Sequence, residues 1–340
     1  MVSDAVGSKL AAEAVANRSE NVVIKPEITG DVTKAEVSIP ASAVGRIGNE
    51  TDASLTVSTP IADVTIPNGA LSALSGAGGT VSVTAEQVDN TVVLTLTAGG
   101  RDVGDLPGGL TLTVPTQDAG PGTVAVLVYA DGTREIIRKS VADDSGVRIP
   151  LNGSATVAIV DNSREFEDVS AESWAADAVA FASAHEMFNG TSGTTFSPEL
   201  SMSRAMLATV LYNLESNPDT AFSGTFADVE GGAWYAESVS WAANCGIVTG
   251  YGDGSFGADN SITREQLAVM LWRYAGSPTA NEQALDFTDA GQASGYAMEA
   301  LAWAAANGIL NGYGDGRIDP TGLATRAQAA QMLKNFMENT

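Results

Sequence analysis

Three arginine residues occupy the same position in three copies of a repeated sequence. They occur in the pairs Ser203-Arg204, Thr263-Arg264 and Thr325-Arg326, each at the predicted start of a helix. A cation at this end of a helix opposes the helix dipole, so local helix energetics do not favour it. One interpretation is an ion pair with an aspartate of the repeat: Asp168, Asp228 or Asp289. The other is a guanidinium fork that, together with the N–H groups of the helix start, holds a carboxylate-bearing sugar.

The loops between the paired helices carry a second set of residues with binding chemistry. These residues are Gly250, Tyr251 and Asp253 in one copy and Gly312, Tyr313 and Asp315 in the next. The aspartates can bond sugar hydroxyls while the tyrosines stack on a sugar face, or the aspartates can instead close a turn through their own backbone. Trp241 and Trp303 precede the loops. Large aromatic residues at a repeated helix position usually belong to the core, although a tryptophan at a groove can also contact a sugar.

The elements that position these residues recur with a period near sixty residues. Phe166, Phe226 and Phe287 open the copies and lie 60 and 61 residues apart. Each copy reads as a helix, a glycine loop and a second helix, which is the pattern of an array. Capping boxes are predicted at Thr263 with Gln266 and at Thr325 with Gln328. Because no copy can cover its own apolar stripe, we expect the three copies to close a bundle around a common axis.

The N-terminal half has a different pattern. Residues 5–18 read as a short helix, and after Pro26 apolar and polar residues alternate. Strands are predicted near residues 35–39, 54–58, 64–66, 80–84, 91–97, 110–114, 124–129, 134–138, 147–149 and 155–160. Short strands with Gly and Pro between them predict one antiparallel β-sandwich over residues 21–161, behind an N-terminal helix at 1–20. This half contains no histidine and no cysteine, and we see no reactive cluster in it.

The net charge of the chain limits the classes of partner that it is expected to bind. The chain carries 17 basic and 41 acidic residues, a formal net charge of −24. Nucleic acids and anionic membrane surfaces are bound by clustered Lys and Arg, so neither is an expected partner. No apolar run approaches the length of a membrane span, and no signal peptide is predicted at the N-terminus. Residues 161–340 hold 7 basic and 23 acidic side chains, and three of the seven are the repeated arginines.

Several kinds of catalytic or metal site find no support. Cys245 and His185 are the single cysteine and histidine, so neither a disulfide nor a Ser-His triad is expected. The glycine-rich run at 252–257 follows a helix rather than a strand, which argues against a dinucleotide site. Read as a calcium loop from Asp253, its twelfth position is Arg264 instead of Glu. We therefore expect no cofactor, no metal and no catalytic residue, although a carboxylate pair for glycoside hydrolysis stays open.

The repeats resemble the S-layer homology domain. The resemblance rests on Phe-x-Asp-Val, then Trp-Ala-x-x-x-Gly-Ile-x-x-Gly-Tyr-Gly-Asp-Gly-x-Phe, then Ile-Thr-Arg-Glu-Gln, and it covers residues 165–216, 225–276 and 286–338. It implies a pseudo-trimer that attaches without covalent bonds to secondary cell-wall polysaccharide, often pyruvylated, in grooves between neighbouring repeats. The implied contacts are Arg204, Arg264, Arg326, Gly250, Tyr251, Asp253, Gly312, Tyr313, Asp315, Trp241 and Trp303.

The sequence thus predicts an α+β multidomain protein of the cell surface, held on the extracellular wall without catalysis. One alternative is the anchor region of a larger surface hydrolase whose catalytic domain lies outside this chain. Another is a lattice subunit that self-assembles through its N-terminal module. The first copy has Thr191-Ser192-Gly193-Thr194 in place of Tyr-Gly-Asp-Gly and Met206 in the capping position. We therefore expect three copies for folding but two competent grooves.

Overall fold

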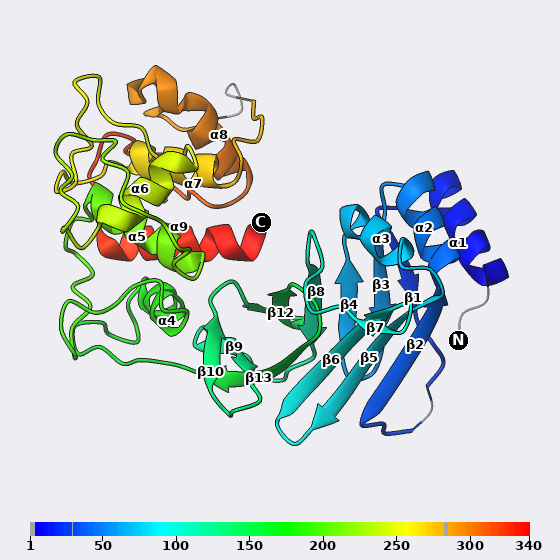
Figure 1. The fold of residues 1–340 in the computed structure, drawn as a ribbon. Helices are drawn as coiled ribbons and strands as arrows, with labels where there is room; N and C mark the ends of the chain where they lie inside the picture. The colour runs from blue at the N-terminus through cyan, green and yellow to red at the C-terminus, as the bar shows by residue number, and fades with distance from the viewer. Residues whose placement is uncertain (1–3, 29, 282–284) are drawn as a thin grey trace. The chain divides into compact units, whose positions relative to one another are not determined.

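A computed structural model describes residues 4–28, 30–281 and 285–340. The chain divides into two compact units, residues 1–162 and residues 163–340. The first unit is built mainly from strands and the second from helices (Figure 1). Within the described ranges, no helix combines the length and apolar character that crossing a membrane requires.

In its described residues, the first unit contains three helices and two sheets. Its helices are α1 (Asp4–Asn17), α2 (Ala41–Glu50) and α3 (Asn68–Ser75). One sheet has the order β1-β3-β4-β8-β12-β11, with β1 (Asn21–Ile24), β3 (Ser54–Ser58), β4 (Asp63–Ile66), β8 (Leu110–Val114), β12 (Gly146–Leu151) and β11 (Val141–Asp143). The other has the order β10-β9-β13-β6-β5-β2, with β10 (Arg134–Ile137), β9 (Thr123–Val128), β13 (Ala155–Asp161), β6 (Thr91–Ala98), β5 (Thr80–Val88) and β2 (Lys34–Pro40); β7 (Arg101–Asp102) pairs with β6.

Alternation along the strands produces the core of this unit. In β6, every second residue is buried, and β2, β5 and β8 follow the same pattern. One hydrophobic cluster collects these side chains from both sheets together with residues of α1, α2 and α3. The two-sheet architecture is therefore the predicted one, and the 124–129 and 134–138 strands pair as the expected antiparallel hairpin.

The pairing differs from the prediction at one edge. β1 runs parallel to β3, with Val22 opposite Leu55, so the first sheet is not wholly antiparallel. The reason is the connection between the two strands, which passes through β2 in the other sheet and the whole of α2 before the chain returns. α1 belongs to the same unit, because Ala11 and Ala14 are part of its core.

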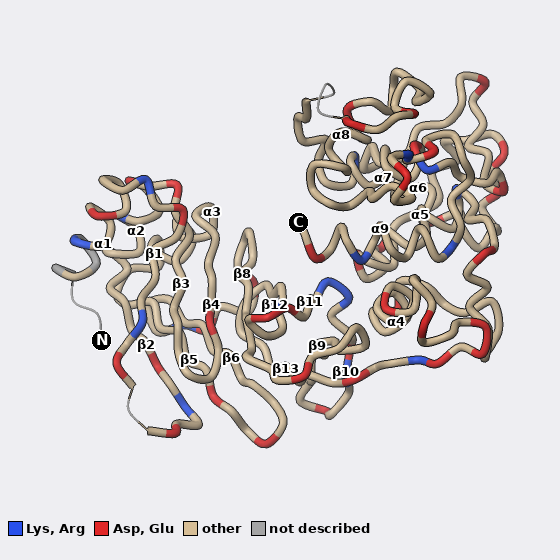
Figure 2. Tube along the Cα trace, turned by 180° about the vertical axis from the view of Figure 1, so that it is seen from behind, with Lys and Arg blue, Asp and Glu red and all other residues tan. Residues whose placement is uncertain are grey.

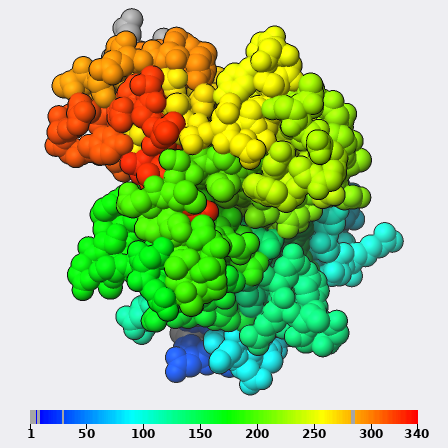
Figure 3. All heavy atoms as spheres, turned by 90° about the vertical axis from the view of Figure 1, so that its left-hand side faces the viewer, coloured from blue at the N-terminus to red at the C-terminus, as the bar shows by residue number. Residues whose placement is uncertain are grey.

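In its described residues, the second unit contains six α-helices and two 3-10 helices. They are α4 (Ala176–Ala184), α5 (Arg204–Leu214), α6 (Ala236–Asn244), α7 (Arg264–Tyr274), η2 (Ala290–Gln292), η3 (Gly295–Ala297), α8 (Met298–Ala306) and α9 (Arg326–Asn339). The main helix pairs form between neighbouring repeats: α5 packs on α6, α7 packs on α8, and α9 returns to pack on α4. The second helix of each repeat thus packs on the first helix of the next repeat, and the second helix of the third repeat packs on the first helix of the first repeat. Figure 3 shows the repeats as adjacent lobes coloured green, yellow and orange.

A ring of backbone hydrogen bonds lies where the three repeats meet. The Met202 N–H donates to the Ala324 carbonyl at 2.9 Å, Ala324 donates to Ile262 at 2.9 Å, and Ile262 donates to Met202 at 2.8 Å. All three residues are completely buried. A buried backbone group needs a partner, and here each repeat supplies the partner of the next. The predicted closed bundle is therefore present, with its axis through this ring.

Candidate functional site

The three repeated arginines join neighbouring repeats. Arg204 Nε donates to the Phe256 carbonyl at 2.9 Å, and its Nη2 donates to the Thr249 carbonyl at 3.1 Å. Arg264 makes the matching bonds to Ile318 (2.6 Å) and Asn311 (3.2 Å). Arg326 makes them to Phe196 (2.9 Å) and Asn189 (2.7 Å), which closes the cycle from the third repeat to the first. We call each such arrangement an arginine clamp.

The clamps differ from the ion pair considered from sequence. Among the residues that the structure describes, no arginine of a clamp lies within ion-pair distance of a carboxylate. The arginines are only 4–7% exposed, and burial lowers the pKa of each guanidinium, which nevertheless stays charged. The guanidinium groups instead donate hydrogen bonds to backbone carbonyls of the next repeat.

The helix starts beside these arginines are also occupied. The Arg264 N–H donates to the Gly322 carbonyl at 2.9 Å, and the Glu265 N–H donates to the Pro320 carbonyl at 2.9 Å. The third N–H, of Gln266, bonds the Thr263 hydroxyl within the predicted capping box, and Thr325 with Gln328 forms the second box. The expectation that these N–H groups share in holding an anion is therefore wrong, because the neighbouring loop already uses them.

The repeated aspartates hold the loop that each clamp grips. Asp228 accepts from the Phe256 and Gly257 N–H groups, both at 2.7 Å. Asp168 and Asp289 do the same one repeat earlier and later. Desolvation acts against ionisation, but the two backbone donors outweigh it, so the pKa of each carboxyl lies below its usual value.

Phe256 shows how the two interactions combine. Its N–H donates to Asp228 of its own repeat, and its carbonyl accepts from Arg204 of the preceding repeat. Phe196 and Ile318 hold the same place in the other two clamps. Aspartate and arginine are thus coupled through one peptide residue rather than through direct contact. Sequence spacing does not reveal this coupling, because its two ends belong to different repeats.

One nitrogen of each arginine remains available at the surface. Nη1 of Arg204, Arg264 and Arg326 makes no hydrogen bond to any residue in the described ranges. It is also not among the fully enclosed nitrogens that lack a partner. Each guanidinium therefore grips a loop with two nitrogens, while the third has no protein partner in the described ranges and is not fully enclosed.

Half-exposed tyrosines flank two of these guanidinium groups. The Arg204 guanidinium lies 5.0 Å from the centre of the Tyr251 ring, and that of Arg264 lies 4.8 Å from the centre of the Tyr313 ring. These distances fit cation–π contacts. Arg326 instead faces the buried rings of Phe188 and Phe196. The first repeat, which lacks the loop tyrosine, thus leaves its clamp without a surface aromatic ring.

The remaining loop residues shape the turn. A Cβ at Gly250 would lie 2.5 Å from the Ser255 carbonyl oxygen and 2.7 Å from the Phe226 ring, and Gly312 is equally confined. Asp253 accepts from the Ser255 N–H at 3.0 Å and from its hydroxyl at 2.7 Å. Asp315 accepts from the Arg317 N–H at 3.1 Å and forms an exposed ion pair with its side chain. These contacts account for the aspartates as turn residues, while their exposure leaves them accessible.

The helix aromatics pack in the interior. Trp241 contacts the Tyr212 ring and Trp303 the Phe336 ring, and both tryptophans are buried. Their counterpart Phe181 stacks on His185, whose Nδ1 lies 2.8 Å from the Phe181 carbonyl oxygen. The core assignment of these residues from sequence agrees with this packing.

Sequence reasoning missed a more exposed set of aromatic residues. Trp174, Trp234 and Tyr296 occupy one position of the repeat, eight or nine residues after the opening phenylalanine, and are 57–64% exposed. Large apolar rings at a repeated surface position are typical of a binding surface. Their constant spacing from Phe166, Phe226 and Phe287 was the signal that could have identified them.

Glu265 makes the surroundings of the three clamps unequal. This buried carboxylate accepts from the Ser294 N–H at 2.9 Å, the Ser294 hydroxyl at 2.8 Å and the Tyr296 hydroxyl at 3.0 Å. Partial burial, with Glu265 beside it, raises the pKa of Tyr296 to about 12. Ala205 and Ala327 replace Glu265 in the other repeats. A negative charge therefore lies next to Tyr296, which is itself within electrostatic reach of Arg204.

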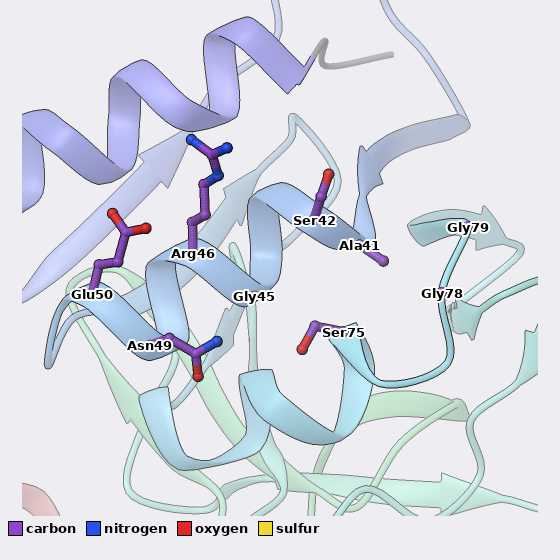
Figure 4. A pocket seen from close by; sticks show the side chains of 9 residues that line it. All are labelled: Ala41, Ser42, Gly45, Arg46, Asn49, Glu50, Ser75, Gly78 and Gly79. Atoms are coloured by element: carbon purple, nitrogen blue, oxygen red, sulfur yellow. The ribbon is translucent and has the colours of Figure 1, made fainter.

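The first unit has a concavity of its own between α2 and α3. Its volume is about 510 Å³, and the side chains of Arg46, Asn49 and Glu50 from α2 border it with Ser75 from α3 (Figure 4). Its lining contains no aromatic ring. It therefore lacks the stacking surface that the second unit offers.

The second unit is strongly acidic. Acidic residues are spread over its loops (Figure 2), in agreement with a net charge of −16 for residues 161–340. In the part of the chain that the structure describes, no group of three or more His, Cys, Asp or Glu side chains is arranged to hold a metal ion. Positive charge is thus concentrated at the clamps and at a few other basic side chains.

Comparison with known proteins finds three tandem matches that begin at the same residues as the predicted repeats. The S-layer homology domain profile matches residues 165–206, 225–268 and 286–330. An amylopullulanase of Thermoanaerobacterium thermosulfurigenes is 30% identical over 65% of this chain and 12% of its own length. A cellulosome-anchoring protein of Acetivibrio thermocellus is 27% identical over 44% of this chain and 35% of its own length. An S-layer protein of Bacillus licheniformis is 29% identical over 41% of this chain and 16% of its own length.

The family match and the geometry concern the same repeats. The chain spans between 12 and 35% of the length of these relatives, and the amylopullulanase match, at 65% of this chain, extends beyond residues 163–340. The three matched segments coincide with the three units that the arginine clamps join. The C-terminal unit of this chain consists of three tandem domains of the S-layer homology family.

Proposed function

We propose that the helical unit attaches the chain non-covalently to the bacterial cell wall by binding an anionic wall polysaccharide, without catalysis. The observation that carries the proposal is the Nη1 of Arg264, which has no protein partner in the described ranges and lies beside the half-exposed Tyr313 ring. A guanidinium recognises a carboxylate, and a flat ring stacks on a sugar. A pyruvylated sugar presents both features. The relatives include a cellulosome-anchoring protein and an S-layer protein, which supports a surface location.

The three clamps are expected to bind unequally. Glu265, which follows Arg264, places a negative charge beside Tyr296, and Tyr296 lies within electrostatic reach of Arg204. The corresponding residue after Arg326, in the repeat that Arg264 grips, is the uncharged Ala327. A carboxylate repels an anionic ligand, so the Arg204 groove should be the weaker of the two that carry a tyrosine. At Arg326 the tyrosine is missing. We propose that the groove of Arg264 and Tyr313 makes the principal contact.

Wall sedimentation tests the proposal. The full chain is mixed with purified cell-wall sacculi and with sacculi stripped of their polysaccharide, and the bound fraction is measured after centrifugation. We expect binding to intact sacculi alone. Tyr313→Ala should reduce the affinity roughly fivefold or more, since stacking on an aromatic ring contributes about 1 kcal/mol. Tyr251→Ala should have a smaller effect.

The matched control is Tyr129→Ala, which removes a tyrosine of similar exposure from the first unit. This variant should sediment like the unaltered chain. Equal binding to intact and stripped sacculi would refute polysaccharide recognition. Unchanged binding of Tyr313→Ala would refute the assignment of the groove.

The relatives that degrade polysaccharides suggest a second context for the same anchor. An amylopullulanase, an exoglucanase and an endoglucanase each match this chain over 12 to 20% of their own length. We propose that the helical unit is a transferable anchor that such enzymes combine with separate catalytic domains. The activities of those enzymes are not assigned to this chain.

A further inference from the structure

A groove separate from the solvent-facing tyrosines lies between the first and second repeats. It is formed by the C-terminal ends of α5, α6 and α7 and has a volume of about 340 Å³, at the lower end of the usual range for small-molecule sites. Glu215, Trp241, Cys245, Arg273 and Tyr274 border it. All of these residues belong to the helical unit, so the groove does not depend on the placement of the other unit.

Arg273 is the residue that first points to a ligand. It lies in the last turn of α7, and its Nη1 donates to the Thr249 hydroxyl at 3.3 Å. Throughout the described ranges it has no carboxylate within ion-pair distance. Four of the five N–H donors of its guanidinium therefore have no protein partner there. In a unit of net charge −15, a half-buried cation without a counter-charge is available to an anion.

The other walls of the groove suit a sugar. The Tyr274 hydroxyl donates to Glu215 at 2.5 Å, and burial together with this carboxylate raises the pKa of Tyr274. The phenol therefore stays protonated and continues to donate. A carboxylate has several acceptor positions, so Glu215 can also accept from sugar hydroxyls. Trp241, which packs on Tyr212, supplies an apolar surface.

The combination of residues that borders the groove is not repeated at the corresponding positions of the other copies. Asn213 and Asn335 stand where the second repeat has Arg273, and Asn335 is buried with its amide bonded to the Ile309 carbonyl. Ala275 and Met337 replace Glu215. The combination of guanidinium, carboxylate and tryptophan thus occurs at a single junction of the described bundle.

The groove is also connected to the first arginine clamp. Thr249 accepts from Arg204 through its carbonyl and from Arg273 through its hydroxyl. Arg204 and Arg273 are near enough for each to affect the other electrostatically. Two cations therefore flank one residue, one from each side of the junction.

We infer that this groove is an additional subsite for a carboxylate-bearing sugar residue, with its carboxylate on Arg273, its hydroxyls on Glu215 and its ring against Trp241. The inference rests on the proposed polysaccharide function and names a second contact for the same polymer. Because Thr249 links the two cations, a single polysaccharide chain occupies this subsite and the neighbouring Arg204 groove.

Cys245 provides a direct readout, because it is the single cysteine of the chain, is exposed and borders the groove. The rate at which the full chain reacts with a thiol reagent is measured at increasing concentrations of cellobiouronic acid. Cellobiose, the same disaccharide without the carboxylate, is the matched ligand. We expect the acid to slow the reaction in a saturable way and cellobiose to bind at least tenfold more weakly.

Variants assign the effect to Arg273. Arg273→Gln should weaken protection by the acid roughly tenfold or more, since a hydrogen bond to a charged group contributes about 1.5–3 kcal/mol. Arg101→Gln removes an exposed arginine from the first unit and should change nothing. Far-ultraviolet circular dichroism confirms that each variant is folded.

The outcomes separate this inference from the proposed function. Absence of protection, equal protection by both disaccharides, or unchanged protection in Arg273→Gln overturns the subsite. If the chain sediments with sacculi while released wall polysaccharide leaves Cys245 fully reactive, anchoring stands and the subsite fails. If the acid protects Cys245 while the chain does not sediment, the subsite stands and anchoring fails.

Discussion

Arg264→Ala should destabilise the helical unit by far more than an ordinary surface substitution. Arg264 is almost fully buried and bonds the Ile318 carbonyl at 2.6 Å and the Asn311 carbonyl at 3.2 Å. Its removal eliminates two charge-assisted hydrogen bonds and leaves a carbonyl of a completely buried residue without a donor. At about 1.5–3 kcal/mol for each such bond, less the desolvation cost that alanine avoids, the expected loss is roughly 3–5 kcal/mol.

Arg264→Lys tests whether the positive charge or the planar shape of the guanidinium stabilises the clamp. Lysine keeps the positive charge but presents a single ammonium in place of the planar fork, so it cannot reach both carbonyls in the same way. We expect it to recover about half of the lost stability. The control is Arg317→Ala, which removes an exposed arginine paired with Asp315 and should cost less than about 1 kcal/mol.

Tryptophan fluorescence during urea unfolding measures these changes in the helical unit alone, because all five tryptophans lie within residues 163–340. The free energy of unfolding follows from the transition midpoint and slope. If Arg264→Ala is no less stable than Arg317→Ala, the clamp is not a structural element and the reasoning is refuted. If stability is unchanged but wall binding is lost, the arginine acts on the ligand alone.

Three further outcomes test other contacts of the bundle. The carboxyl groups of Asp168, Asp228 and Asp289 have folded pKa values below the ordinary 3.8, so the stability that they contribute is present above about pH 4 and is lost as the pH falls through the folded values. In Asp228→Asn, the loss of stability with falling pH, followed by fluorescence, should therefore be shallower than in the unaltered chain. An unaltered profile would contradict this. Gly250→Ala should destabilise the unit by about 2 kcal/mol or more because its Cβ would overlap the Ser255 oxygen, whereas Gly252→Ala, with open space around it, should be nearly neutral in the same urea titration. Thr263→Ala removes half of a capping box and should cost about 1 kcal/mol; a neutral result would show that the helix start is held by the neighbouring repeat alone.

Local features of the chain could be predicted because their causes are local. Alternation in residues 91–97 depends on two faces of one strand, and β6 follows that alternation over its whole length. The capping boxes at Thr263 and Thr325 depend on residues three positions apart, and both form. The parallel pairing of β1 with β3 could not be predicted in this way, because a pairing partner is chosen by the path of the intervening chain and not by either strand.

The same distinction between local and long-range causes applies to the candidate site. Sequence repetition alone identified the three arginines, the glycine loops, the three copies and their closure into one bundle, since a repeated apolar stripe must be covered by its neighbours. Only the tertiary structure decided that Arg264 grips the loop of the following repeat, that the helix-start N–H groups are already occupied, and that Arg273 borders a groove at a single junction. The physical reason is that a buried guanidinium bonds whichever carbonyl groups surround it, and these come from a segment more than forty residues away in sequence.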